Sequence, residues 1–125
     1  MSTEENKTNE LEYFLSEKGT FLVVSFNGSI TKSTVPALEK CQGDVLNSQA
    51  QSVVLNLHDV TKVDLSGIPP FALLQHAIRK KPAKLRLCFI KADFAKLLLD
   101  RVAIRREEVT ANLKDALESL KKLPH

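Results

Sequence analysis

The 125-residue chain contains no tryptophan, two cysteines and four glycines, and these shortages exclude several classes of protein. Cys41 and Cys88 lie far apart without a CxxC spacing or a histidine cluster, which argues against a disulfide framework and a metal site. Scattered glycines provide no phosphate-binding loop. No apolar run approaches the roughly 20 residues of a membrane-spanning helix. The sequence therefore predicts neither a bound metal or cofactor nor an integral membrane segment.

Charge and composition indicate one ordinary globular domain. Basic residues exceed acidic ones by only three, too few to indicate a nucleic-acid binder. Residues 1–9 are polar and unlike a signal peptide, so we expect a flexible N-terminal segment followed by one domain over residues 10–121. The unpaired cysteines fit a reducing, cytoplasmic location.

The hydrophobic pattern predicts the order β-β-α-β-α-β-α-β-α. Strands are expected at residues 11–16, 21–26, 53–57, 85–90 and 107–110. Helices are expected after residue 33, after residue 67, at 93–101 and around 113–120. Such alternation predicts an α/β fold with a mixed, mostly parallel sheet of four to five strands and about four helices. The expected core comprises Val54, Leu55, Leu57, Phe71, Leu74, Leu87, Phe89, Leu117 and Leu120.

The sequence Asp64-Leu65-Ser66-Gly67 lies at a strand-to-helix junction and is followed closely by two prolines. Ser66 could cap the helix, act as a nucleophile or carry a regulatory phosphate. No sequence spacing forces a histidine toward Ser66, and His58, the nearest candidate, is typical of a solvated turn residue. We therefore predict no catalytic residue and no enzyme activity. Pro69 and Pro70 suit a helix start but remove backbone donors from its first turn.

The strand VVLNL at residues 53–57, followed by DLSG at 64–67 within this element order, resembles the STAS domain family. That family includes bacterial anti-sigma factor antagonists and the tails of sulfate transporters. The residues GSIT at 28–31 and KDAL at 114–117 correspond to two further family motifs. Three features depart from the family pattern: Asn56 and Thr31 replace acids, Leu65 replaces the first serine, and Pro69-Pro70 follow the glycine.

The resemblance implies a bacterial anti-sigma factor antagonist that binds an anti-sigma factor with serine kinase activity. It further implies that Ser66 is the phosphorylated residue. The implied partner surface comprises Asp64, Leu65, Ser66, Gly67, Ile68 and Thr31. The alternative is a non-phosphorylated adaptor, either a subunit of a lipid-transport ATPase complex or a stressosome-like scaffold. We expect a monomer or a weak homodimer.

Basic residues are concentrated in two groups. Five of the eight residues at positions 79–86 are basic, and Arg101, Arg105 and Arg106 form the second group. Such runs are usually solvated helix ends. An anionic partner or lipid surface is the alternative, and it requires the two groups to converge on one face.

Overall fold

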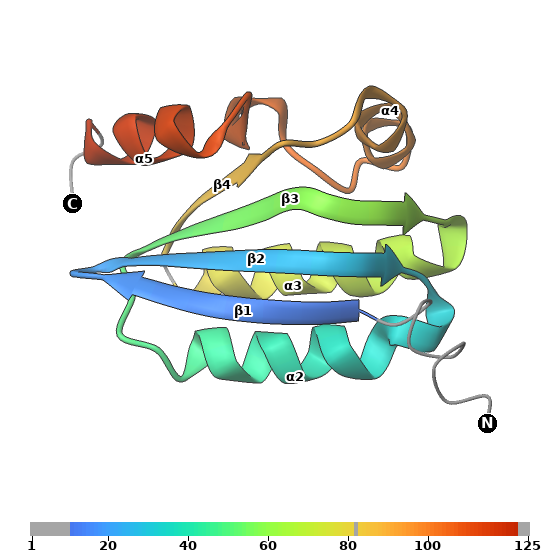
Figure 1. The fold of residues 1–125 in the computed structure, drawn as a ribbon, viewed down its shortest axis with the longest axis horizontal. Coiled ribbons are helices and arrows are strands. Elements are labelled where there is room, and N and C mark those ends of the chain that lie inside the picture. The colour runs from blue at the N-terminus through green and yellow to red at the C-terminus, as the bar shows by residue number, and fades with distance from the viewer. Residues whose placement is uncertain (1–10, 82, 123–125) are drawn as a thin grey trace.

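The computed structural model describes residues 11–81 and 83–122, so the segment predicted to be flexible, residues 1–9, lies outside the described residues. Within the described residues, five strands and four α-helices follow one another in the predicted order, β-β-α-β-α-β-α-β-α (Figure 1). The strands are β1 (Leu11–Lys18), β2 (Phe21–Ile30), β3 (Ser52–Val63), β4 (Lys84–Cys88) and β5 (Val109–Thr110). The helices are α2 (Val35–Leu46), α3 (Ile68–Lys80), α4 (Ala92–Asp100) and α5 (Leu113–Lys121). Three 3-10 turns join them: η1 (Lys32–Thr34), η2 (Leu65–Gly67) and η3 (Arg106–Glu108).

The strands form a single sheet in the order β1-β2-β3-β4-β5. β1 and β2 are an antiparallel hairpin whose two-residue turn begins at Gly19, where the φ of 61° favours glycine. All other neighbours pair in parallel. The predicted mixed, mostly parallel α/β fold is confirmed.

The helices cover both faces of the sheet, and the residues of β3 alternate between them. Val53, Leu55 and Leu57 belong to the larger core, which α2 and α3 cover and to which α4 contributes Phe94 and Leu98. Val54 packs on the opposite face in a smaller cluster with Cys88 and the α5 residues Ala116 and Leu120. Burial on both faces explains why the sequence of β3 begins as a continuous apolar run.

Several predicted element bounds were wrong. β3 is twelve residues long and continues to Val63, because its second half still pairs with β2, after two shifts of register. β4 stops at Cys88 because Phe89 has a φ of 60°, which no extended strand allows. The predicted edge strand at residues 107–110 is reduced to Val109–Thr110, preceded by the turn η3.

Burial confirms most of the predicted core. All of it is buried except Phe89 and Leu117, which are partly buried at the edge of the α5 cluster. Leu46 is 40% exposed, because it is the last residue of α2. The buried side of α2 consists of Leu38, Cys41 and Val45.

Both cysteines are free and buried, which yields a prediction. Burial, together with the charge of Asp44, raises the pKa of Cys41 to about 12, and burial raises that of Cys88 to about 11. Native protein at about pH 8 should therefore resist iodoacetamide, whereas urea-unfolded protein should react fully. In the unfolded protein the thiols ionise at their ordinary, lower pKa. The free energy of unfolding should therefore stay constant below that pKa and decrease as the pH rises toward 11 and 12. Rapid alkylation of the native protein, measured by mass spectrometry, would contradict this prediction.

Candidate functional site

The sequence Asp64-Leu65-Ser66-Gly67 lies where the carboxyl ends of β2 and β3 meet, at the right of Figure 1. The last residues of the two strands, Ile30 and Val63, are paired in register. The Asp64 N–H then donates to the Ile30 carbonyl at 3.2 Å. In parallel sheets this edge is where binding sites are commonly formed, because the loops after neighbouring strands converge there.

Asp64 caps the turn that leads into α3. Its Oδ1 accepts the Gly67 N–H at 3.1 Å and the Ser66 hydroxyl at 2.6 Å. The hydroxyl of Ser66 in turn accepts the Lys32 N–H at 2.9 Å. The helix-cap role considered for Ser66 therefore belongs to Asp64. Ser66 is exposed in the middle of η2, and its hydroxyl joins the two loops that follow β2 and β3.

The two prolines occupy the second and third positions of α3, which begins at Ile68. An amide N–H at these positions would have no partner within the helix, so proline removes no intrahelical hydrogen bond. The two N–H groups just before the prolines are already used, because Gly67 donates to Asp64 and Ile68 donates to the Leu65 carbonyl. The first three positions of α3 thus provide no free backbone donor of the kind that usually binds a phosphate.

Gly67 allows the two loops to approach closely. It is buried, and a Cβ atom at this position would lie 2.2 Å from the Ile30 carbonyl oxygen and 2.8 Å from the Thr31 nitrogen. Both neighbours are backbone atoms that cannot rotate away. Glycine is therefore required for the contact that places Ser66 beside Lys32.

Thr31 organises the facing loop from a buried position, with an exposed fraction of 9%. Its N–H donates to the Thr34 hydroxyl at 2.9 Å, and the Thr34 N–H donates to the Thr31 carbonyl at 3.1 Å. Thr31 and Ser66 line a polar hollow of about 380 Å³ that also includes Lys32 and Lys62. The Asp64 carboxylate therefore contacts the Ser66 hydroxyl, and two lysines line the same hollow.

Exposed apolar side chains continue from Ser66 along α3. Leu65 is 54% exposed and Leu73 is 62% exposed, with the exposed Pro69 between them one helical turn before Leu73. We call Leu65, Ser66, Pro69 and Leu73 the Ser66 surface. Exposed leucines beside a polar contact residue are typical of protein-binding surfaces.

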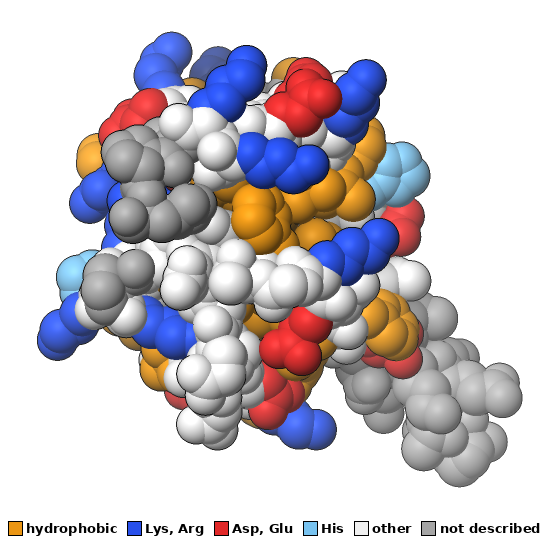
Figure 2. Space-filling view, turned by 90° about the vertical axis from the view of Figure 1, so that its left-hand side faces the viewer, with side chains coloured by type: hydrophobic (Ala, Val, Ile, Leu, Met, Phe, Trp, Pro, Cys, Tyr) orange, Lys and Arg blue, Asp and Glu red, His pale blue; other side chains and the backbone are white. Residues whose placement is uncertain are grey.

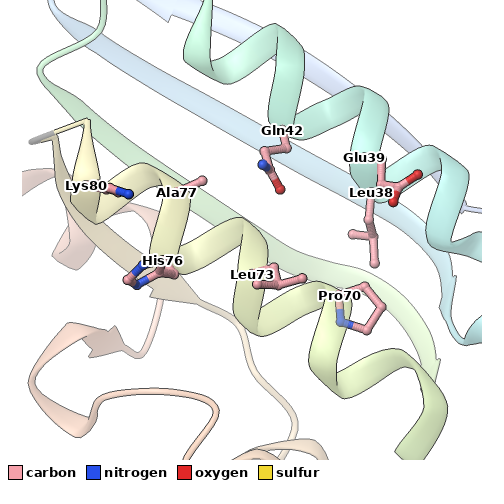
Figure 3. A pocket seen from close by; sticks show the side chains of 8 residues that line it. All are labelled: Leu38, Glu39, Gln42, Pro70, Leu73, His76, Ala77 and Lys80. Atoms are coloured by element: carbon pink, nitrogen blue, oxygen red, sulfur yellow. The ribbon is translucent and has the colours of Figure 1, made fainter.

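A groove of about 380 Å³ runs between α2 and α3 beside this surface. Figure 3 shows Glu39 and Gln42 on α2, and Pro70, Leu73 and His76 on α3, around the groove. Its walls carry both charged and apolar groups, and Leu73 links the groove to the Ser66 surface. The groove extends the possible contact area along α3.

The structure divides the predicted partner-binding residues into two sets. Leu65 and Ser66 are exposed and Asp64 is partly buried, whereas Gly67, Ile68 and Thr31 are buried and position the loops. The sequence reasoning missed Lys32, Lys62 and Leu73. Leu73 follows Pro69 by four residues, and this spacing was a usable signal. Nothing in the sequence indicated that Lys32 would lie against Ser66.

The basic run at residues 79–86 is largely engaged in contacts within the chain. Arg79 forms a bidentate pair with the mostly buried Glu108, at 2.5 Å and 3.1 Å. Lys81 donates to the carbonyls of Val45 and Ser48, at 3.1 Å and 2.6 Å. On the face at the left end of Figure 1, where this run lies, basic side chains are dispersed among acidic and uncharged ones (Figure 2). The interactions support a structural role for this run.

The histidines and potential metal ligands of the described residues are dispersed. His58 is exposed, contacts Asp59 at 2.9 Å and stacks edge-to-face on Phe89. Within residues 11–81 and 83–122, no histidine is hydrogen-bonded to Ser66, and no cluster of three potential metal ligands occurs. Across the same residues, every helix is too short or too polar to span a membrane.

This geometry defines a small α/β domain with a serine-bearing turn at the carboxyl edge of its sheet. The STAS domain family matches residues 15–119, and the chain belongs to that family. A search of curated proteins gives no sequence match.

Solved structures share the fold at low sequence identity. An anti-sigma factor antagonist from Mycobacterium paratuberculosis has a TM-score of 0.77 and 20% identity, over 90% of this chain and 95% of that one. A serine-to-glutamate variant of RsbS from Moorella thermoacetica has a TM-score of 0.72 and 15% identity, over 88% and 95%. The murine Solute Carrier 26 family member A9 anion transporter has a TM-score of 0.69 and 21% identity, over 85% of this chain but 18% of the transporter. The fold thus occurs both in separate regulators and as part of a transporter.

Proposed function

We propose that this protein is a bacterial, cytoplasmic anti-sigma factor antagonist that acts by binding and has no catalytic activity. The Ser66 surface would bind an anti-sigma factor with serine kinase activity. Phosphorylation of Ser66 would prevent this binding. The observation that carries this proposal is the exposed Ser66 hydroxyl between the Asp64 carboxylate and the Lys32 N–H, flanked by the exposed Leu65. Similarity in fold to anti-sigma factor antagonists supports the same class of function.

The local electrostatics support a switch that changes binding more than folding. A phosphate would add about −1.5 to −2 charges beside the Asp64 carboxylate. The α3 terminus offers it no free donor in its first three positions, because Ile68 is bonded and Pro69 and Pro70 have no N–H. Lys32 and Lys62 line the solvent-open hollow and can partly balance the charge. The phosphate would therefore remain at the surface, where a partner must desolvate it at substantial cost.

The corresponding prediction concerns Ser66→Glu. We expect this variant to melt within a few degrees of the wild type, because the side chain faces solvent, but to bind the partner at least about tenfold more weakly. The partner would be isolated from lysate of the native cells on the immobilised wild-type protein, identified by mass spectrometry and purified. Affinity would then be measured by isothermal titration calorimetry.

Two variants control for causes other than the added charge. Ser66→Ala removes the hydroxyl without adding charge, so a comparable loss of affinity would assign the effect to the lost hydrogen bonds. Ser16→Glu makes the same change at an exposed serine of β1, toward the opposite end of the sheet, and should bind normally. Wild-type affinity of Ser66→Glu, with no phosphate on Ser66 in cells, would refute the switch.

One observation favours the adaptor as a second candidate. The Ser66 hydroxyl both donates to Asp64 and accepts from Lys32, which is a complete structural role without phosphorylation. An adaptor in a lipid-transport ATPase complex or a stressosome-like scaffold would use the same surface constitutively. Recovery of transporter or scaffold subunits on the wild-type protein, with Ser66 unmodified, would favour this candidate.

A further inference from the structure

The connection after α4 places a valine where glycine is usual. Val102 has a φ of 54°, in the left-handed region that is unfavourable for a β-branched residue. The Val102 N–H donates to the Leu99 carbonyl at 3.0 Å, and the Ala103 N–H donates to the Leu98 carbonyl at 2.8 Å. These two bonds form a Schellman motif, in which glycine commonly occupies the position of Val102.

The described part of the protein gains little from this side chain. Val102 is 88% exposed, the largest exposed fraction among the bulky hydrophobic residues that the structure describes. An apolar side chain stabilises the fold only through the area that it buries, so its own packing does not offset the backbone strain. Strained residues of this kind concentrate at functional sites, which suggests a contact outside the chain.

The backbone that carries Val102 is held firmly. Gln75 is fully buried on α3, and its Nε2 donates to the Ala103 carbonyl at 2.8 Å. Its Oε1 accepts from Arg79 at 3.3 Å, while Ala103 and Ile104 are themselves buried. Binding of a partner at Val102 would therefore cost little entropy, because the loop that carries Val102 is already ordered.

Val102 also lies close to the Ser66 surface. It forms one wall of a groove of about 330 Å³ together with Arg101, and Leu65, Pro69 and Ala72 form the opposite wall. Leu65 immediately precedes Ser66, so one partner could cover both the groove and the serine. Arg101 is exposed and forms no ion pair within the described residues, which leaves its charge available at the groove.

We propose that Val102 is a contact residue for the protein partner that covers Ser66. The groove takes an apolar side chain of that partner, with a carboxylate beside it facing Arg101. This inference rests on the proposed function, since it assigns a second contact to the same interface. Burial of Val102 in the complex would explain why a strained and exposed valine stands on a rigid loop.

The test compares Val102→Gly with the wild type, using the purified partner isolated on the immobilised wild-type protein. Glycine relieves the strain, so the melting temperature should rise by about 3 °C. Loss of the apolar contact should weaken binding about tenfold, measured by isothermal titration calorimetry. A variant that is more stable yet binds less well is the signature of a residue retained for binding.

Two further variants distinguish the lost contact from a loosened backbone. Asparagine also tolerates the left-handed conformation but is polar, so Val102→Asn should bind as weakly as Val102→Gly without the added backbone freedom of glycine. Leu46→Ala shortens an exposed apolar side chain at the far end of α2 and should bind like the wild type. Equal affinity of Val102→Asn and the wild type would show that backbone flexibility, and not the lost contact, weakened Val102→Gly, and would overturn the proposed contact.

The outcomes separate the two proposals. If Val102→Gly binds normally while Ser66→Glu binds weakly, the Val102 contact is refuted and the proposed function stands. If Val102→Gly binds weakly while Ser66→Glu binds normally, the groove is used and the serine switch is refuted. Normal binding by both variants, or recovery of no partner at all, overturns both proposals.

Discussion

Leu55→Ala is expected to lower the free energy of unfolding by about 2–5 kcal/mol, with a fall in melting temperature of roughly 10 °C. Leu55 is fully buried in β3, where it pairs with Val24 of β2 and Leu87 of β4. Its removal would leave a cavity between the sheet and its covering helices that the paired strands cannot close. Chemical denaturation followed by circular dichroism would measure the change.

Leu73→Ala is the matched control, because it makes the same chemical change at a leucine that is 62% exposed. Its stability should lie within about 0.5 kcal/mol of the wild type. Leu87→Ala should behave like Leu55→Ala. If both core variants melted at the wild-type temperature, the register of β3 and β4 would be wrong.

Gly67→Ala is expected to destabilise the protein by about 3 kcal/mol, near the upper end of the usual cost of overpacking. The added Cβ would lie 2.2 Å from the Ile30 carbonyl oxygen, so the loops after β2 and β3 must separate. That movement would also break the Lys32–Ser66 hydrogen bond. Loss of stability should therefore accompany altered amide chemical shifts at residues 30–34 and 64–68, measured by nuclear magnetic resonance.

Gly43→Ala provides a control, because it makes the same substitution but should change the stability in the opposite direction. Gly43 lies within α2, and a Cβ atom there would meet nothing within 4 Å. Alanine should therefore stabilise the helix by about 0.8 kcal/mol. A stabilising Gly67→Ala, or a strongly destabilising Gly43→Ala, would contradict the described backbone positions.

The alternating strands and helices could be predicted from the sequence because each element carries its own periodic signal. The apolar run at residues 53–57 indicated a strand buried on both faces, and β3 has this property. Its continuation to Val63 was missed, because residues 58–62 are mostly polar and strand pairing with β2 keeps them extended. Local pattern predicts burial more reliably than it predicts where a paired strand ends.

The site was predictable in part. The position of Ser66 before a helix, and the suitability of two prolines at a helix start, follow from local backbone chemistry. The identity of the cap was not decided locally, because Asp64 and Ser66 both carry an oxygen that can accept an N–H. Only the approach of the loop after β2 brings Lys32 to Ser66 and leaves Asp64 as the cap.

By itself, the sequence determined that this is an α/β domain with a serine at the junction between a strand and a helix. Periodicity and turn chemistry act over a few residues and are legible without a structure. The tertiary structure alone decided which side chains surround that serine. Lys32, Lys62 and Val102 come from three separate segments, and their proximity to Ser66 or Leu65 depends on strand register, the contact at Gly67 and the packing of α4. These are long-range relations, and no short stretch of sequence encodes them.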